Sequence, residues 1–322
     1  MRETILSIAS PLGPAVTLCK NSWQASGSPD ATLSIVSGMH GDQLNGLYLN
    51  SRLIRFLNDV AEGREADFKL KGKVQVFPVV NIHAVRSATR LWSFDDLDLD
   101  LAFPGNEKGE VAEQIAQCIL THTVDSTHGV ILKTGDHLYE DAPHAQLLQA
   151  DRATRKMAQS LGLNIARELA KSPTSQLNLL YHWGETGISS LMLSIGRPQT
   201  LDRVLCDSVF EGLLNLLVHT EVLSATRGKN AKTDLHLFRS NGNYSILSEQ
   251  AGLFIPEVEA GNFLKQGQKL GELRDIYSGE TLEEYTVPKD GYLVTLRQHP
   301  VVYEKEPVAI LLTEKKSGFW PF

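Results

Sequence analysis

A short apolar run at 32–36 passes directly into a glycine-rich segment at 38–46, and this junction limits the folds open to the chain. The apolar run is typical of a buried β-strand. The glycines that follow it indicate a tight turn into a helix at 46–62. A strand followed closely by a helix is the repeating unit of α/β folds, so the junction predicts that class.

His40 lies in this turn, at the end of the predicted strand, where a ring nitrogen can bind a metal. A Zn²⁺ site of this kind would normally have a carboxylate three residues further on. The residue at that position is Gln43. A neutral amide brings no negative charge to offset the cation, so this pattern looks like a metal site that has lost a ligand.

Strand-like and helix-like segments alternate through the first two thirds of the chain. We expect strands at 32–37, 74–80, 129–133, 178–182 and 190–195. We expect helices at 46–62, 109–121, 151–170 and 200–218. The helix at 151–170 is inferred from the apolar residues Met157, Leu161, Ile165 and Leu169, which are spaced by four. The alternation predicts a mainly parallel or mixed sheet with helices on both faces.

The residue pattern changes near residue 236, where short apolar segments are separated by frequent glycines. This pattern predicts a small C-terminal all-β sandwich. We therefore expect two domains, an α/β domain at 1–235 and a β-sandwich at 236–322.

Four polar residues follow the ends of predicted strands, and they are His40, Asn81, Lys133 and Ser194. In open parallel sheets, ligands bind at the carboxyl ends of the strands. We therefore expect these side chains to lie close together at one edge of the sheet.

The motifs around these residues resemble the succinylglutamate desuccinylase/aspartoacylase family of the zinc carboxypeptidase superfamily. The resemblance covers almost the whole chain, in the same order and spacing, and its C-terminal part resembles biotinyl and lipoyl carrier folds. Besides the His40 turn, it rests on Val76-Phe77-Pro78-Val79-Val80-Asn81, Arg90, Asp98-Leu99-Asp100-Leu101-Ala102-Phe103-Pro104-Gly105, Leu132-Lys133-Thr134-Gly135 with Pro143-His144, and Leu193-Ser194-Ile195-Gly196.

The resemblance implies a zinc site in which most of the functional positions have changed. His40 keeps its ligand position, but Gln43 replaces a Glu ligand and Lys133 replaces a His ligand. Ser194 stands where the family has its general base, a Glu. Arg90 keeps the position of a substrate-binding Arg, and the other candidates for binding a substrate are Arg86, Asn81, Asp98 and Asp100.

Lys133 follows the apolar run Val130-Ile131-Leu132, so it belongs to a buried strand or lies just beyond it. A buried ammonium is costly without a partner. We therefore hypothesise that Lys133 occupies the space of the metal and pairs with Asp42, Asp98 or Asp100. In the alternative interpretation, Lys133 is a solvated loop residue.

Other histidines leave two further alternatives open. His128 becomes the third ligand position if the register is shifted by five residues. A metal site could also be rebuilt around His40 from other histidines near predicted strand ends, namely His137, His144 and His182.

Two functions from different classes follow. The family hydrolyses an amide that joins an acyl group to an amino acid, with a metal-activated water and a Glu that moves protons. Loss of a general base alone typically costs about 10²–10⁴-fold in rate. We therefore expect a non-catalytic binding or regulatory relative, with no cofactor. The alternative is a metal-dependent deacylase that acts on an N-acyl amino acid or a related small acidic substrate, with zinc held in a rearranged site.

Composition restricts the partners. The net charge of −7 provides no basic surface for nucleic acid. No apolar run approaches the roughly 20 residues that span a bilayer. Three scattered cysteines, Cys19, Cys118 and Cys206, are typical of a reducing compartment. We expect a cytoplasmic protein with no signal peptide, which binds a small acidic ligand or a partner protein. A homo-oligomeric state is an alternative that the sequence leaves open.

Overall fold

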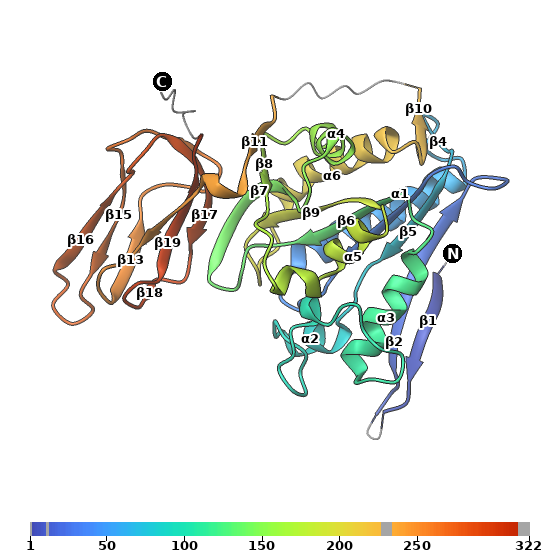
Figure 1. Cartoon of the computed structure of the whole chain (residues 1–322), viewed down its shortest axis with the longest axis horizontal. Helices are drawn as coiled ribbons and strands as arrows, with labels where there is room; N and C mark the ends of the chain where they lie inside the picture. Colours follow the sequence, from blue (N-terminus) through green and yellow to red (C-terminus); the bar gives the residue numbers. More distant parts are fainter. Residues whose placement is uncertain (1, 11–12, 227–233, 315–322) are drawn as a thin grey trace, which may run out of the picture.

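The computed structural model describes residues 2–10, 13–226 and 234–314, which form a larger α/β part and a smaller C-terminal β part (Figure 1). The helices are α1 (Leu44–Ala61), α2 (Ile82–Ser87), α3 (Val111–Thr123), α4 (Arg152–Ser160), α5 (Leu179–Glu185) and α6 (Arg203–His219), with 3₁₀ turns at Leu99–Leu101, Thr174–Leu177 and Ser240–Gly242. The strands of the α/β part are β1 (Arg2–Ile8), β2 (Val16–Gln24), β3 (Thr32–Ser37), β4 (Phe68–Leu70), β5 (Lys73–Phe77), β6 (His128–Lys133), β7 (Tyr139–Leu147), β8 (Ile165–Glu168), β9 (Ser189–Gly196), β10 (Leu223–Ala225) and β11 (His236–Phe238).

The main sheet is mixed, with a parallel centre. Its strands run in the order β1-β2-β5-β3-β6-β9-β7, and the sheet then continues into the C-terminal part. Strand β3 pairs in parallel with both β5 and β6, and β6 pairs in parallel with β9. Strands β2 and β7 flank this centre in the antiparallel direction. The expected mainly parallel or mixed sheet is therefore confirmed.

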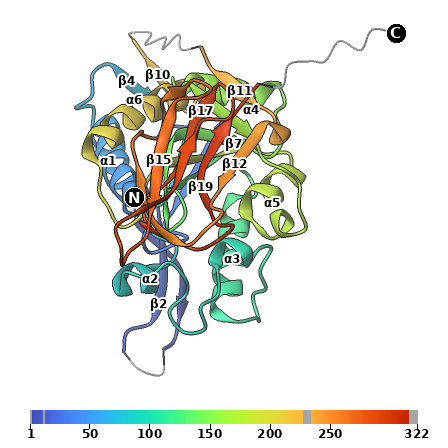
Figure 2. The same ribbon diagram turned by 90° about the vertical axis from the view of Figure 1, so that its left-hand side faces the viewer.

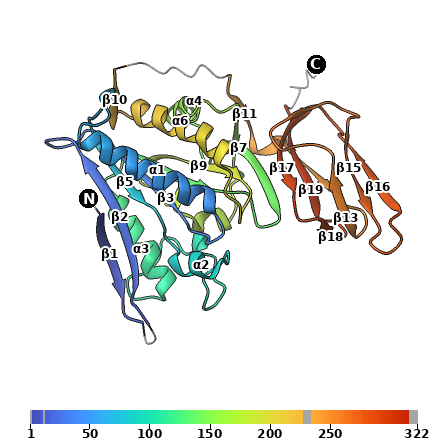
Figure 3. The same cartoon turned by 180° about the vertical axis from the view of Figure 1, so that it is seen from behind.

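Helices cover both faces of this sheet, as Figures 1 and 3 show from opposite sides. Helices α1, α4 and α6 contribute to one buried core, whereas α3 and α5 contribute to a second core on the other face. Alternate residues of each central strand enter different cores, as Ile35 and Val36 do in β3. This alternation follows from the two-residue period of a strand, and it explains why these strands are apolar throughout. None of the helices in the described part of the chain combines the length and the apolar composition that spanning a bilayer requires.

The C-terminal part is a β-sandwich with its own core, and it joins the main sheet edge to edge. Its strands are β12 (Asn243–Leu247), β13 (Gly252–Pro256), β14 (Phe263–Leu264), β15 (Lys269–Arg274), β16 (Thr281–Thr286), β17 (Gly291–Arg297), β18 (Val301–Val302) and β19 (Pro307–Leu312). Seen from its own side, β15, β17 and β19 lie in front of the α/β part (Figure 2). Strand β17 pairs with β7, and β11 pairs with β8. A continuous sheet thus crosses the expected boundary at residue 235, and the division into two domains stays a prediction.

Two expected elements are wrong. The segment expected as a strand at 178–182 is helix α5, which begins where the Asn178 side chain accepts a hydrogen bond from the Tyr181 backbone N–H. The helix expected at 151–170 ends at Ser160, and Ile165–Glu168 is strand β8. Gly162 ends the helix because its backbone has a φ of 68°, which glycine adopts at little cost.

The contact between Gly129 of β6 and Trp183 of α5 provides a test of this packing. A Cβ added at Gly129 would lie 2.4 Å from Trp183 Cε3. We expect Gly129→Ala to destabilise the protein by about 1–3 kcal/mol in urea unfolding, because this overpacks the core. The matched control is Gly184→Ala in α5, where an added Cβ meets nothing within 4 Å. It should be neutral or stabilising by up to about 1 kcal/mol, since alanine favours the helix. Equal stability of both variants would contradict the packing of α5 on β6.

Candidate functional site

Three of the four expected strand-end residues, His40, Lys133 and Ser194, lie near one another at the carboxyl edge of the parallel sheet, and Asn81 does not join them. Lys133, the last residue of β6, lies beside Ser194 of β9 in the sheet register. His40 follows β3, in the turn that leads into α1. Gly41 permits this turn, because a Cβ there would lie 2.1 Å from the Ala84 carbonyl carbon. The turn therefore holds the backbone of His40 tightly against the segment that follows β5.

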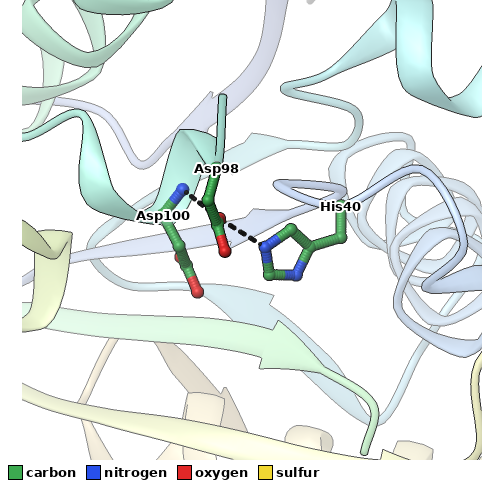
Figure 4. Close-up of side chains that lie close together, drawn as sticks. All are labelled: His40, Asp98 and Asp100. Atoms are coloured by element: carbon green, nitrogen blue, oxygen red, sulfur yellow. Dashed lines mark hydrogen bonds and ion pairs between the residues drawn. The ribbon is translucent and has the colours of Figure 1, made fainter. Parts of the chain in front are cut away.

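Both ring nitrogens of His40 are engaged, and the side chain is buried. Gln43 Nε2 lies 2.8 Å from His40 Nδ1. An amide nitrogen can only donate, so Nδ1 is the acceptor and the ring proton is on Nε2. His40 Nε2 lies 2.6 Å from Asp98 Oδ1, to which it donates (Figure 4). The lone pair that could bind a metal is therefore occupied by the Gln43 amide.

Lys133 forms an ion pair with Asp100, with Nζ 2.5 Å from Oδ2. The two side chains are only 22% and 11% exposed, so little water screens the pair. Burial raises the pKa of Asp100, but the charge of Lys133 outweighs burial and lowers it overall. Lys133 is therefore not a solvated loop residue, and among the three expected partners it pairs with Asp100.

Asp98 connects His40 to an arginine at the mouth of the site. Its Oδ2 lies 3.5 Å from Arg90 Nη2, and Arg90 Nη1 lies 2.7 Å from Asp136 Oδ1. Burial raises the pKa of Asp98, but the hydrogen bond from His40, together with the charge of Arg90, lowers it to about 2. Asp98 is thus a permanent anion with partners on both oxygens.

Ser194 donates a hydrogen bond to Asp141 Oδ2 at 2.6 Å. The other oxygen of Asp141 accepts from Thr295 Oγ1, also at 2.6 Å. Asp141 lies on β7 and Thr295 on β17, so the C-terminal part contributes to the site. Sequence reasoning did not find Asp141, since no motif marks it and its contacts depend on long-range strand pairing.

A cavity of about 290 Å³ opens beside these groups. Its polar lining includes Arg90, Lys133, Asp141, Gln146, Arg167 and Ser194. Arg167 was not among the sequence candidates, because strand β8 was expected to be part of a helix. Pro307 and Ile310 of the C-terminal part line the same cavity. The cavity is at the lower end of the size range of small-molecule sites, which suits a ligand of amino-acid size.

Three sequence candidates lie outside this arrangement. The amide of Asn81 accepts from the Ala84 backbone N–H and donates to the Met39 carbonyl, so it is a structural helix cap and not a ligand contact. Arg86 is exposed and does not line the cavity. His128 begins strand β6, at the opposite end from Lys133, so the shifted register is wrong.

The histidines proposed to rebuild a metal site do not gather around His40. His137 is exposed beside Asp136, and His182 belongs to helix α5. His144 is buried, with Nδ1 2.8 Å from the Ala142 carbonyl and Nε2 2.9 Å from Gln146 Nε2. Burial lowers the pKa of His144 to about 4, so its ring is neutral near pH 7.

The residues at the three family ligand positions do not fit a zinc ion. They offer one imidazole whose Nδ1 is already bonded, a neutral amide and an ammonium. Among the described residues, one other group could hold a cation, and it consists of His40, Asp98 and Asp100 with ligand atoms within 4.8 Å of one another (Figure 4). Each of these three residues already pairs with another protein group, so a metal would have to compete with those contacts.

Comparisons with known proteins agree with this fold. No protein-family model matches the chain. The chain is 24% identical over 289 residues to N-α-acetyl-L-2,4-diaminobutyric acid deacetylase of Halomonas elongata, covering 87% of this chain and 81% of that protein. The crystal structure of a succinylglutamate desuccinylase/aspartoacylase from Rhodobacter sphaeroides is 20% identical with a TM-score of 0.79, covering 98% of this chain and 96% of that one. The product-bound structure of the ectoine utilization protein EutE from Ruegeria pomeroyi is 18% identical to this chain, with a TM-score of 0.80. The match covers 97% of this chain and 95% of that one. The resemblance expected from the motifs is confirmed at the level of the fold.

The Lys133–Asp100 pair provides a first test of the site. We expect Lys133→Met to destabilise the protein by about 3 kcal/mol in urea unfolding, because it leaves the Asp100 carboxylate buried without a cation. The double variant Lys133→Met/Asp100→Asn should regain most of this loss, because it removes both charges. The matched control is Lys71→Met, which breaks an exposed pair with Glu221 and should cost less than about 1 kcal/mol. Additive effects of the two site substitutions would contradict the ion pair.

The low pKa of Asp98 provides a second test, through the pH dependence of stability. Its folded pKa of about 2 lies below the value of about 3.9 for an unfolded chain, so its carboxylate stabilises the fold above pH ~4. That contribution disappears as the pH falls through about 2. We expect Asp98→Asn to cost about 2 kcal/mol at pH 7, and the difference from wild type to narrow as the pH falls from about 4 towards 2. Urea unfolding at several pH values measures this, and a pH-independent difference would refute it.

Proposed function

We propose that this chain, which has the fold of the succinylglutamate desuccinylase/aspartoacylase proteins, is a non-catalytic binding or regulatory relative that binds a small acidic ligand without a metal. The observation that carries the proposal is the ion pair between Lys133 and Asp100 at the carboxyl edge of the sheet. It supports the idea that a side-chain cation replaces a metal ion in stabilising this edge.

Electrostatics favours this function over metal binding. A divalent cation placed about 4 Å from an ammonium is repelled by about 8 kcal/mol at an effective dielectric constant of about 20. Lys133 would therefore have to leave the site or lose its proton before a metal could bind beside Asp100. His40 would also have to give up its hydrogen bond from Gln43.

At the position of the family's general base, the described structure has the hydroxyl of Ser194, which already donates a hydrogen bond. A serine hydroxyl that donates to a carboxylate cannot take a proton from water at neutral pH. Asp141 is the nearest carboxylate to Ser194 in the hydrogen-bond network, but its oxygens already accept from Ser194 and Thr295. These contacts suit a binding pocket better than a hydrolytic site.

The second candidate function is a metal-dependent deacylase with a rearranged site. The observation that favours it is the proximity of His40, Asp98 and Asp100. Similarity to a deacetylase of N-α-acetyl-L-2,4-diaminobutyric acid makes an N-acyl amino acid the substrate class to test. We rank it second because each of the three residues is already paired. A partner protein, a homo-oligomeric state and a cytoplasmic location stay predictions.

Metal analysis combined with a hydrolysis assay tests the proposal. We expect the purified protein to contain far less than one zinc per chain and not to hydrolyse N-acetyl amino acids, with or without added Zn²⁺. The triple variant Gln43→Glu/Lys133→His/Ser194→Glu should bind zinc, because it restores two ligands and removes the ammonium. The control Ser194→Glu, which alters no ligand position, should stay free of zinc. Hydrolysis by the wild-type protein that zinc stimulates and His40→Ala abolishes would overturn the proposal.

A further inference from the structure

A second cavity, of about 760 Å³, opens where strand β11 of the α/β part meets the C-terminal sandwich. None of its lining residues lines the cavity at the sheet edge. We call it the aromatic groove, and the lining residues that matter here are His236, Phe238, Phe263, Tyr292, Leu312 and Glu314. Its volume lies within the range of sites that enclose a drug-sized molecule, so it has room for two large side chains.

Four aromatic rings form the wall of the groove, with Tyr292 at their centre. The ring centroids of Phe263, His236 and Phe238 lie 5.0, 5.2 and 6.0 Å from that of Tyr292. Phe263 meets Tyr292 in a T-shaped contact, yet its own side chain is 46% exposed. A further ring can join such a cluster through the same edge-to-face or offset contacts. The groove therefore favours an aromatic occupant.

The sequence that follows the groove is rich in aromatic residues. Glu314, the last described residue, lines the groove. After Lys315-Lys316-Ser317-Gly318, the sequence continues as Phe319-Trp320-Pro321-Phe322. Trp320 is six residues beyond Glu314, so even a fully extended chain keeps it within about 22 Å of the groove wall. A tether of this length gives an effective concentration on the order of millimolar, so a weak intrinsic affinity is enough for docking.

The other tryptophans of the chain are all removed from water. Trp23, Trp92 and Trp183 are 6%, 3% and 1% exposed. Burying a large aromatic side chain is favourable because it removes a large apolar area from water. The aromatic groove offers such burial to Trp320 directly beside Glu314.

We propose that residues 319–322 of this chain dock in the aromatic groove, with Trp320 packed against Phe263 and Tyr292. A residue before proline favours an extended backbone, in which side chains two residues apart point to the same side. Phe322 therefore enters the groove beside Trp320. The docked segment connects β11 of the α/β part with β14 and β17 of the sandwich, and it stabilises the joint between the two parts. This role is independent of what the cavity at the sheet edge binds.

A second copy of the chain is the main competing occupant, because it carries the same segment. The tether favours the intramolecular arrangement, since an effective concentration on the order of millimolar exceeds the micromolar concentration of a protein in a typical measurement. The two arrangements differ in their dependence on protein concentration, and this difference enters the test.

Iodide quenching of tryptophan fluorescence in the full chain tests the proposal, because Trp23, Trp92 and Trp183 are buried. The signal of Trp320 is the difference between wild type and Trp320→Phe. We expect iodide to quench this signal several times less than it quenches the free peptide Ser-Gly-Phe-Trp-Pro-Phe. The protection should not depend on protein concentration, since the contact is intramolecular.

Substitutions on both sides of the contact should release Trp320. Phe263→Ala removes a ring of the groove, and Phe322→Ala removes the second ring of the segment. Each should lower the ratio of docked to free segment about 2–10-fold, as expected for the loss of one aromatic pair, and so raise the quenching. The matched control Tyr277→Ala removes a 97% exposed ring of the sandwich outside the groove and should quench as wild type does. If Phe263→Ala melts far below wild type, Phe322→Ala decides the matter, because it leaves the groove intact.

Three results would overturn the proposal. Quenching of Trp320 as strong as in the free peptide would show that the segment does not dock. Unchanged quenching in Phe322→Ala, and in a folded Phe263→Ala, would show that Trp320 is protected somewhere else. Protection that is lost on dilution, together with a dimer in size-exclusion chromatography, would show that the groove binds the segment of a second copy.

Discussion

The ion pair between Lys133 and Asp100 sets the charge at the carboxyl edge of the parallel sheet. Lys133 is the last residue of a buried strand, so its ammonium needs a counter-charge close by. The 3₁₀ turn after α2 supplies it, because Asp98 caps this turn through the Asp100 backbone N–H at 3.0 Å. The residue that orients Asp100 is thus also the residue that accepts a hydrogen bond from His40. These contacts share residues, so a change in the charge of one group would change the electrostatic environment of the others.

A continuous series of hydrogen bonds and ion pairs adjoins this pair at the sheet edge. It runs from Gln43 through His40 and Asp98 to Arg90 and Asp136. Donors and acceptors alternate along it, and the Arg90 guanidinium lies between the carboxylates of Asp98 and Asp136. A metal ion at His40 would have to displace its hydrogen bond from Gln43 or its hydrogen bond to Asp98, and this supports the proposed binding function.

The sequence predicted the parts of this site that depend on local chemistry. Strand ends of a parallel sheet meet at one edge, so His40 and Lys133 were expected together, and a lysine after a buried strand was expected to have a carboxylate partner. Arg167 was missed for a physical reason. Four apolar residues between 157 and 169 have the spacing of a helix face, yet Gly162 ends the helix and the residues after it form a strand. Asp141 was missed because its partners come from strands β9 and β17, and no local pattern encodes which antiparallel strands pair.

The pairing of β7 with β17 gives the C-terminal sandwich a part in the site. Thr295 holds one oxygen of Asp141 while Ser194 holds the other, so the carboxylate is fixed between the two parts of the chain. Pro307 and Ile310, which also belong to the sandwich, form an apolar part of the cavity wall. The sandwich therefore provides part of the wall of a cavity whose charged residues, Arg90, Lys133 and Arg167, belong to the α/β part, so the two parts of the chain form this site together.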